Sequence, residues 1–212
     1  MDRAGGLSRM CNLYTMTATV DELRGLFGPF AGDTANFPPF TEIYPGKPAP
    51  VFRREGAAGL RMDLMDWGFP GPAAAKGRPV TNVRNLASPM WRNALERPDR
   101  RCIVPVSSFC EWSAEPDPET KRKRKHWFGL HEGDDPLFAF AGIWRAGPER
   151  PYMAFLTCDP NTVVGAVHPK AMPVMLRARD VGIWLDSERV TACALAVPFP
   201  DADMRILNQT GR

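Results

Sequence analysis

Cys11 follows Met10 in the segment Met10-Cys11-Asn12-Leu13-Tyr14, and this placement gives one residue two potential nucleophiles. Removal of the chain up to Met10 would leave Cys11 with an α-amine and a thiol on adjacent carbons. Such an amine condenses with an aldehyde to a Schiff base, and the thiol can then close a five-membered thiazolidine ring, which is covalent catalysis by a nucleophile pair. The α-amine has a pKa of about 8, so a modest base makes it reactive at neutral pH. The alternative is that one of five cysteines lies near the N-terminus by chance.

Glu111 and His168 have the side chains and the surroundings of proton-transfer groups. Glu111 lies in a strand-like segment between apolar and aromatic residues, where loss of water would raise its pKa into the range useful for acid and base catalysis. Alternation along a strand could equally leave it at the rim, facing water. His168 precedes Pro169 and Pro173, which restrict the backbone around the imidazole. A single loop histidine can also be structural or solvated, and both interpretations stay open.

Asn82 and Arg84 alternate in a short strand-like segment, which would direct both side chains to one face. An amide that donates and accepts, beside a guanidinium that prefers phosphate, suits a site that binds a nucleic-acid backbone. Turn formation alone could also explain Asn82. The basic run 121–125 is a second candidate for a polyanion contact, but the acidic residues and prolines just before it favour a solvated hairpin loop.

The sequence argues against a metal and against a nucleotide cofactor. Cys102, Cys110, His126 and His131 lack the closely spaced ligand pairs of structural zinc sites. No glycine-rich phosphate loop of the Walker or dinucleotide type occurs. We therefore expect neither a metal nor a cofactor.

The composition is that of an ordinary globular protein. The 212 residues suit one domain, with 44% hydrophobic and 24% charged residues, and the net charge of +3 alone does not indicate a polyanion partner. Nowhere do about 18 apolar residues run together, so no membrane partner is expected. Five widely spaced cysteines without a C-x-x-C pair favour a reducing compartment, and we expect a cytoplasmic protein.

The expected elements are short, because 22 prolines and 18 glycines interrupt the chain. Thr19 with Glu22 forms a capping-box pattern for a helix that ends at Gly28, and Ser88 with Pro89 begins a second helix. Together the elements predict a single α+β domain, dominated by antiparallel strands in a barrel-like curled sheet. Further helices are expected at 162–167 and 180–185, and strands at 51–54, 60–67, 102–106, 109–112, 126–131, 137–144, 152–158, 173–176 and 195–198.

Eight short motifs, taken in this order, resemble the SRAP family, the SOS-response-associated peptidases, which are abasic-site processing proteins. They extend from residue 10 to about residue 185, nearly the whole chain. Each motif is short, but their common order is specific. The motifs are Met10-Cys11, Tyr44-Pro45-Gly46, Asp66-Trp67-Gly68, Asn82-Val83-Arg84, Arg101-Cys102-Ile103-Val104-Pro105, Phe109-Cys110-Glu111-Trp112, Phe140-Ala141-Gly142-Ile143-Trp144, and His168 before Met172-Pro173-Val174.

The resemblance implies a fold and a function. It implies a β-rich, barrel-like fold with a basic groove for single-stranded DNA, and an enzyme with lyase-like Schiff-base chemistry that is classed with peptidases and hydrolases. Cys11 would capture the aldehyde of an abasic site as a thiazolidine crosslink, with Asn82, Glu111 and His168 as the other catalytic residues. The partner would be abasic single-stranded DNA, bound by a monomer without cofactor, in the cytoplasm or on the nucleoid. The implied DNA contacts are Arg84, Arg92, Thr157, Lys170 and Trp67.

The N-terminal segment departs from the family pattern. Nine residues precede Met10, and a peptide bond on Cys11 removes its amine. Asp2 is too large for ordinary removal of the first methionine, whereas Cys11 is small enough for removal of Met10. We therefore expect residues 1–9 to be an extension outside a functional domain of residues 10–212, with translation starting at Met10 or cleavage before Cys11.

Two other functions remain compatible with the sequence. A thiol peptidase could use Cys11, Glu111 and His168, and its activity could be confined to removing its own leader. A non-catalytic module for single-stranded nucleic acid would use the arginines and tryptophans and leave Cys11 without a role. Crosslinking to abasic-site DNA separates the three, because only the thiazolidine mechanism predicts an adduct that depends on Cys11.

Overall fold

Strands are the main regular element of the protein. The computed structural model describes residues 11–34, 37–56, 59–71, 77–131 and 137–207, and the expected N-terminal extension and Met10 lie outside these residues. No helix in the described ranges is long and apolar enough to cross a membrane. The strands are β1 (Tyr14–Met16), β2 (Phe30–Ala31), β3 (Phe40–Ile43), β4 (Pro48–Glu55), β5 (Gly59–Trp67), β6 (Asn82–Val83), β7 (Arg101–Val106), β8 (Ser108–Pro116), β9 (Lys123–Leu130), β10 (Phe138–Arg145), β11 (Tyr152–Cys158), β12 (Met172–Pro173), β13 (Met175–Leu176) and β14 (Met204–Leu207), and the helices are α1 (Val20–Phe27), α2 (Pro89–Glu96), α3 (Thr162–Gly165), α4 (Ala178–Asp186) and α5 (Arg189–Cys193).

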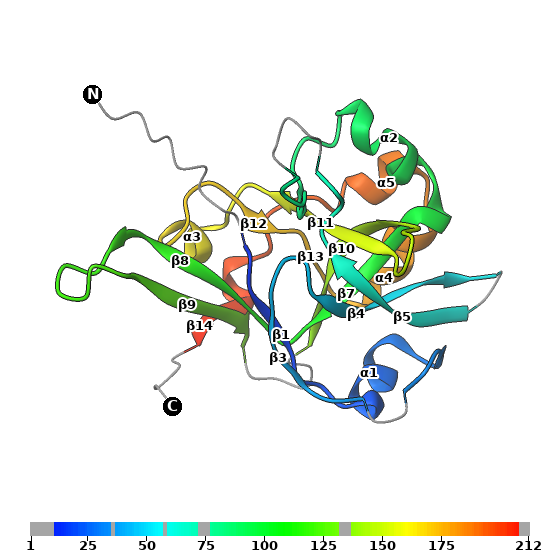
Figure 1. The fold of residues 1–212 in the computed structure, drawn as a ribbon, viewed down its shortest axis with the longest axis horizontal. Helices are drawn as coiled ribbons and strands as arrows, with labels where there is room; N and C mark the ends of the chain where they lie inside the picture. The colour runs from blue at the N-terminus through cyan, green and yellow to red at the C-terminus, as the bar shows by residue number, and fades with distance from the viewer. Residues whose placement is uncertain (1–10, 35–36, 57–58, 72–76, 132–136, 208–212) are drawn as a thin grey trace.

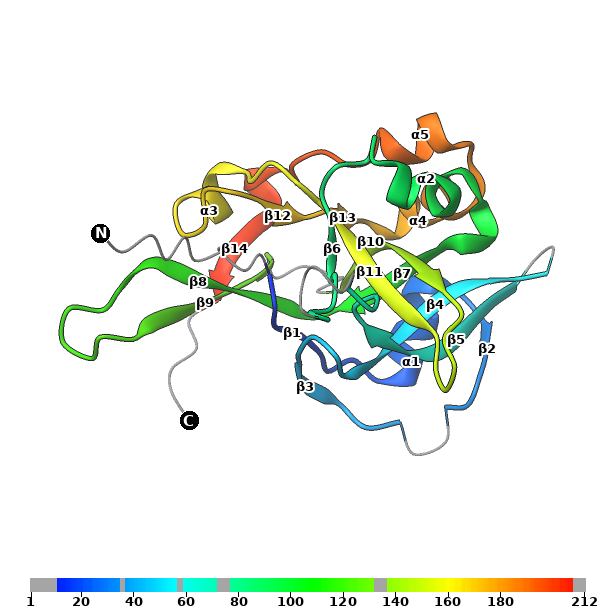
Figure 2. The ribbon, with the colours of Figure 1, turned by 45° about the horizontal axis from the view of Figure 1, so that its top comes forward.

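The strands form two sheets. The smaller sheet has the order β14-β9-β8-β1-β3, and all of its pairs are antiparallel. The larger sheet follows β12-β11-β10-β7-β4-β5-β2, and an additional parallel pair between β11 and β5 makes it curl back on itself. The β8–β9 hairpin projects from one end of the molecule, and α2, α4 and α5 gather at the other (Figures 1 and 2). The expected α+β fold with a predominantly antiparallel, curled sheet is confirmed.

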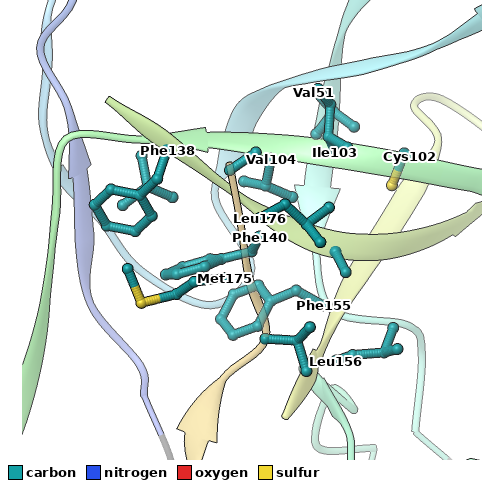
Figure 3. Packing of buried hydrophobic residues seen from close by; sticks show 14 of the residues in the cluster. Val51, Cys102, Ile103, Val104, Phe138, Phe140, Phe155, Leu156, Met175 and Leu176 are labelled. Atoms are coloured by element: carbon teal, nitrogen blue, oxygen red, sulfur yellow. The ribbon is translucent and has the colours of Figure 1, made fainter. Parts of the chain in front are cut away.

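Aromatic side chains from neighbouring strands form the centre of the core (Figure 3). Phe140 lies 4.7 Å from Phe155 and 5.8 Å from both Phe138 and Phe109, measured between ring centroids. All four side chains are at most 1% exposed. Such ring pairs stabilise the fold by about 0.5–1.5 kcal/mol each beyond the burial of apolar area. Tyr14, 5.9 Å from Phe140, ties β1 to this core.

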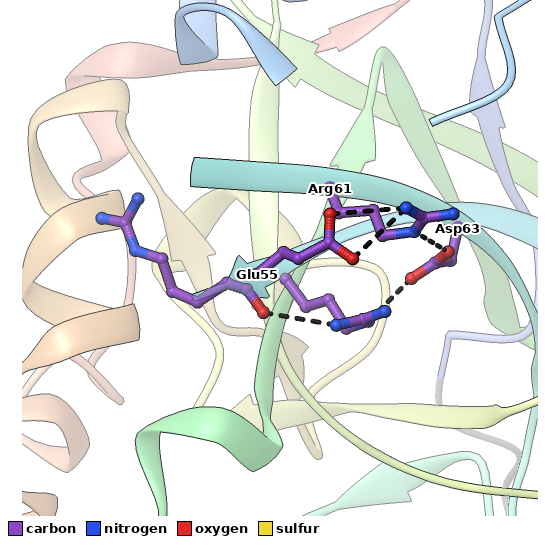
Figure 4. Close-up of polar contacts among 5 residues, drawn as sticks. Glu55, Arg61 and Asp63 are labelled. Carbon is purple, nitrogen blue, oxygen red and sulfur yellow. Dashed lines mark hydrogen bonds and ion pairs between the residues drawn. The ribbon is translucent and has the colours of Figure 1, made fainter. Parts of the chain in front are cut away.

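Like charges face each other across β4 and β5. Arg53 is directly opposite Arg61 in the register of the two strands, a placement that would be destabilising on its own. Asp63 accepts hydrogen bonds from both arginines, at 2.7 Å and 2.9 Å, and Glu55 also binds Arg61 (Figure 4). The carboxylates therefore turn a repulsive pair into an ion-pair network.

The capping signal at the start of α1 is confirmed. Thr19 Oγ1 accepts a hydrogen bond from the Glu22 backbone N–H at 3.2 Å, and the Glu22 carboxylate accepts one from the Thr19 N–H at 2.7 Å. The helix ends at Gly28, whose φ of 79° favours glycine because a side chain would be strained there.

Thr19→Ala is expected to lower the free energy of unfolding by about 1 kcal/mol, because the helix loses a hydrogen-bonded N-cap. Urea denaturation measures this change. Thr19→Ser keeps the hydroxyl and is the control, expected to match the wild type. Equal losses in both variants would show that the cap contributes nothing.

The predictions of helices and strands differ from the structure mainly toward the C-terminus. The strand expected at 195–198 is wrong, because the N–H groups of Leu195 and Ala196 donate to carbonyls three residues earlier and continue the turn after α5. The last strand is instead β14, which pairs with β9. The strand expected at 173–176 is divided into β12 and β13, and the helix expected at 162–167 is the shorter α3.

Candidate active site

Cys11 and Glu111 lie beside each other, just before β1 and within β8. The backbone N–H of the residue before Glu111 donates to the Leu13 carbonyl at 2.9 Å. The indole of the residue after it, Trp112, donates to Asn12 Oδ1 at 3.0 Å. Hydrogen bonds on both sides of Glu111 therefore hold it against the segment that begins with Cys11.

The Glu111 carboxyl is almost completely buried. Its side chain is 1% exposed, and neither oxygen accepts a hydrogen bond of normal geometry from the described residues. Burial raises the pKa of Glu111 to about 8, and the nearby backbone N–H of Cys11 lowers this pKa in part. The carboxyl is thus protonated at neutral pH, next to the Cys11 nitrogen, and can give up its proton as the pH approaches 8.

The Cys11 side chain is held as a neutral thiol. It is 1% exposed, and Sγ donates to the Leu13 carbonyl at 3.7 Å. Burial raises the pKa of this thiol well above its ordinary value, and the charge of Glu111 raises it further. Because a raised thiol pKa disfavours the nucleophilic thiolate, the sulfur is not prepared to attack first.

Tyr14 is a candidate site residue that the sequence patterns do not single out. Its side chain is fully buried, and within the described chain its hydroxyl has no hydrogen-bond partner. Burial raises the pKa of Tyr14 well above its ordinary value, and the neighbouring Cys11 adds to this effect. A buried hydroxyl near Cys11 could donate to an oxygen of a bound ligand. Its position three residues after Cys11 is the signal that could have found it.

His126 was also given no role by the sequence, yet it lies directly opposite Glu111 in the register of β8 and β9. Directly opposite residues point to the same face of a sheet, with Cβ atoms about 5 Å apart. The half-buried imidazole therefore flanks the buried carboxyl. Only the pairing of the two strands, which the sequence does not display, brings these residues together.

Asn82, Thr157 and His168 gather around one end of β11. Asn82 lies on β6, which pairs in parallel with β11 at Phe155. Thr157 is on β11 itself and pairs with Pro173 of β12. His168 lies in the loop that joins α3 to β12. The fold thus brings three of the expected site residues to neighbouring segments.

Asn82 and His168 each have a polar atom suited to a ligand. The Asn82 amide donates to Thr81 Oγ1 at 3.1 Å, while its Oδ1 is buried without a hydrogen-bond partner in the described chain. His168 is 6% exposed, and its Nδ1 lies 3.1 Å from the Ala171 carbonyl oxygen. A carbonyl only accepts, so Nδ1 carries a hydrogen and donates it to this carbonyl.

Trp67 joins these residues to the surroundings of Cys11. Its ring lies 5.2 Å from Tyr14 and 5.0 Å from Phe155, between centroids. Its indole N–H donates to the Thr81 carbonyl at 3.1 Å, directly before Asn82. One aromatic cluster therefore supports both groups of candidate residues.

This packing corrects the expectation that Trp67 contacts DNA. The side chain is 0% exposed, because its ring packs against Tyr14 and Phe155 in the core. Thr157, at 2% exposed, is likewise buried and presents no DNA-facing surface. Both side chains lie in the interior of the fold.

The other three expected DNA contacts are exposed. The Arg84 side chain is 40% exposed and forms an ion pair with Asp159. Arg92 lies on α2 and Lys170 in the loop before β12. Asp159 therefore competes with any phosphate for Arg84. In the described ranges, no three His, Cys, Asp or Glu side chains group as a metal site.

Curated relatives of the chain include two proteins of Bacillus subtilis. Abasic site processing protein YoqW is 26% identical over 190 residues, which cover 84% of this chain and 80% of the relative. Abasic site processing protein YobE is 26% identical over 211 residues and covers 92% of each chain.

Solved structures and a family model agree with this likeness. A crystal structure of a protein from Bacteroides thetaiotaomicron has a TM-score of 0.74 at 19% identity, covering 94% of this chain and 93% of the other. A phage-related protein from Bordetella bronchiseptica has a TM-score of 0.72 at 19% identity, covering 94% and 95%. These structures show the shared fold. The sequence model described as SOS response associated peptidase (SRAP) matches residues 10–208, and the chain therefore belongs to the SRAP family.

Proposed function

We propose that the protein binds abasic sites in single-stranded DNA and crosslinks to them through a thiazolidine at Cys11. The observation that carries this proposal is the buried Glu111 carboxyl beside the Cys11 nitrogen, because opening of the abasic sugar requires a proton donor at neutral pH. The names of YoqW and YobE, abasic site processing proteins, support the same substrate. The crosslink would shield the lesion as part of the DNA damage response.

The reaction proceeds in three balanced steps. Glu111 donates a proton to the ring oxygen of the abasic deoxyribose, and the resulting carboxylate takes up the proton of the C1′ hydroxyl as the ring opens to an aldehyde. The neutral α-amine of Cys11 adds to C1′, and loss of water gives a Schiff base. The sulfur then adds to the same carbon while its proton passes to the nitrogen. Aldehyde and aminothiol thus give a thiazolidine and one molecule of water.

Asn82 and His168 orient the opened sugar in this proposal. The buried Oδ1 of Asn82 is an acceptor for a sugar hydroxyl. The Nε2 of His168 is the proton acceptor for a second hydroxyl or for the aldehyde hydrate, since Nδ1 faces a carbonyl. Burial of Asn82 Oδ1 favours a ligand that satisfies it, because an unpaired buried polar group costs about 1–3 kcal/mol.

The raised thiol pKa argues against a thiol peptidase as the main activity. A cysteine peptidase needs a thiolate, which requires a lowered pKa beside a positive charge. At Cys11, burial and Glu111 act in the opposite direction. A neutral thiol is suited to the second step of thiazolidine formation, where sulfur attacks an electrophilic imine that has already formed.

Adduct formation tests the proposed function. The chain that begins at Cys11, obtained by expression from Met10 and removal of that methionine, is incubated with a single-stranded oligonucleotide that carries one abasic site, and a denaturing gel separates the adduct. We expect an adduct with the wild type and none with Cys11→Ala. Cys193→Ala, at a half-exposed cysteine, is the control and should give wild-type amounts. An adduct of equal yield from Cys11→Ala would overturn the mechanism.

Asp159→Asn is expected to strengthen binding of undamaged single-stranded DNA by about two- to fivefold. The change releases Arg84 from an exposed ion pair, which is typically worth about 0.2–1 kcal/mol, and removes a negative charge near the phosphates. Fluorescence anisotropy of a labelled oligonucleotide measures the affinity. Asp99→Asn, which breaks an exposed pair with Arg97, is the control and should leave affinity unchanged. Unchanged or weaker binding by Asp159→Asn would exclude Arg84 as a phosphate contact.

A further inference from the structure

We propose that the distal half of the β8–β9 hairpin is a second DNA-binding surface, which contacts phosphates several nucleotides from the lesion. This inference rests on the proposed function and extends it to a part of the chain outside the candidate active site. It concerns the segment from Pro116 to Lys125, here called the distal hairpin.

The distal hairpin leads directly away from the candidate active site. Glu111 is buried near the start of β8, and exposure increases along the strand until Ala114, Glu115 and Pro116, which are exposed. β9 follows the same gradient in reverse, from exposed Lys123 to buried residues at its far end. Both views show the hairpin extending past the other described elements (Figures 1 and 2). A DNA strand whose abasic site is bound at Glu111 can therefore continue along this hairpin.

The turn of the distal hairpin has a fixed shape. One carboxylate oxygen of Asp117 accepts hydrogen bonds from the backbone N–H groups of Glu119 and Thr120, both at 2.9 Å, and the other binds the Arg124 guanidinium. These contacts hold the pKa of Asp117 at about 2. Lys121 adopts the left-handed conformation with φ of 56° inside this turn. The cations that follow are thus presented from a rigid turn, which lowers the entropy lost on binding.

The positive charges of the hairpin are only partly neutralised. Arg124 pairs with Asp117, and Lys125 pairs with Glu42. Lys121, Arg122 and Lys123 are exposed and form no ion pair within the described residues. They occupy three consecutive positions from the end of the turn into β9. Two exposed glutamates are also present, but they precede these cations, on β8 and in the first half of the turn, at Glu115 and Glu119.

The outer edge of β9 offers hydrogen-bond donors next to these cations. β14 pairs with β9 only from Trp127 to Leu130 within the described chain, so the edge at 123–126 has no neighbouring strand there. Phosphates bind both to basic side chains and to backbone N–H groups, and such contacts position DNA without reading its sequence. Cationic side chains on an edge strand also protect a sheet from aggregation, which is the alternative role for these side chains.

The length of the hairpin sets the expected position of the contact. Asp117 lies six positions after Glu111, and at about 3.3 Å per position this separation spans about 20 Å. Adjacent nucleotides of one strand advance by about 3.4 Å in a duplex, so this distance corresponds to about six nucleotides, and to fewer in an extended single strand. Short flanks around the lesion would not reach the distal hairpin.

The test compares a triple variant, Lys121→Gln, Arg122→Gln and Lys123→Gln, with the wild type on two single-stranded oligonucleotides. Both carry a tetrahydrofuran analogue of the abasic site, which has no aldehyde and cannot crosslink. One has two nucleotides on each side of the analogue and the other has ten. A triple variant at exposed arginines on other elements is the control, with Arg24, Arg97 and Arg179 each changed to Gln.

We expect the hairpin variant to lower the slope of log affinity against log salt by about two on the long oligonucleotide, since three single-strand phosphate contacts contribute about 0.7 each. On the short one it should match the wild type, and the control variant should keep the wild-type difference between the two lengths. An unchanged slope on the long oligonucleotide, or an equal loss on both, would overturn the inference in favour of edge protection.

Separate measurements test the proposed function and the role of the hairpin. Crosslinking of short abasic oligonucleotides with a reactive aldehyde should be equal for the hairpin variant and the wild type. Absence of any adduct with the wild type would refute the thiazolidine mechanism, while the salt slopes would still decide the role of the hairpin. If the wild type bound neither the short nor the long oligonucleotide, both the proposed function and the role of the hairpin would be refuted.

Discussion

Glu111→Gln is expected to slow adduct formation by about 10²–10⁴-fold while changing the affinity for DNA by less than about twofold. Glutamine keeps the size of the side chain but cannot donate an acidic proton to the sugar ring oxygen. Single-turnover crosslinking at saturating DNA measures the rate of the chemical step. The control is Glu115→Gln, which changes an exposed glutamate on the same strand and should leave the rate unchanged.

The pH dependence of crosslinking identifies the protonation state in which Glu111 acts. Because burial raises its pKa to about 8, the carboxyl can donate a proton at neutral pH and loses this ability as the pH rises through about 8. The wild-type rate should therefore fall above this pH, whereas the residual rate of Glu111→Gln should show no such decrease. A decrease that survives in the glutamine variant would assign the titration to another group.

Stability offers an independent measurement of the same pKa. The folded chain keeps the Glu111 proton up to about pH 8, whereas the unfolded chain releases it near the ordinary value of 4.5. The raised pKa contributes its full stabilisation of the folded chain below pH 4.5, the pKa of the unfolded chain. This contribution is lost as the pH rises through about 8, the pKa of the folded chain. Relative to Glu111→Gln, the wild type should therefore lose unfolding free energy between pH 5 and 8. Parallel curves for the two proteins would show that Glu111 titrates normally.

Local patterns predicted the elements of this fold better than their pairing. The bounds of β11 agree with the expected 152–158, since its apolar run ends at turn residues, and the Thr19 cap fixes the start of α1. Pairings over long sequence distances, such as β14 with β9 and β11 with β5, have no local signature. For the same reason the apolar segment 195–198 was taken for a strand, although local hydrogen bonds keep it in a turn.

The candidate site shows the same limit at the level of single residues. Residue types alone identified Cys11 and Glu111, but their proximity depends on the pairing of β1 with β8, almost a hundred residues apart in sequence. The sequence left open whether Glu111 faces water, and its burial is what raises the pKa. The resemblance to the family implied that Trp67 contacts DNA, but a tryptophan can either stack on a base or fill a core. Only the packing against Tyr14 and Phe155 distinguishes these roles.

Crosslinking is expected to be lost completely when the Cys11 nitrogen carries an acyl group. In an amide the nitrogen lone pair is delocalised, so it cannot form a Schiff base. The thiol alone can give only a reversible hemithioacetal. The chain of 212 residues, in which ten residues precede Cys11, should therefore form no adduct that survives denaturation, whereas a chain that begins at Cys11 should form one.

This comparison is best made with two samples that differ only in whether the residues before Cys11 have been removed. A protease site inserted directly before Cys11 allows one preparation of the long chain to be divided, and half of it to be cut. Intact mass confirms the new N-terminus, and a denaturing gel measures adduct on abasic single-stranded DNA. Cutting should restore crosslinking, and acetylation of the exposed amine should abolish it again. Equal adduct from the cut and acetylated samples would mean that sulfur alone holds the DNA, because an acetylated nitrogen cannot take part in a thiazolidine.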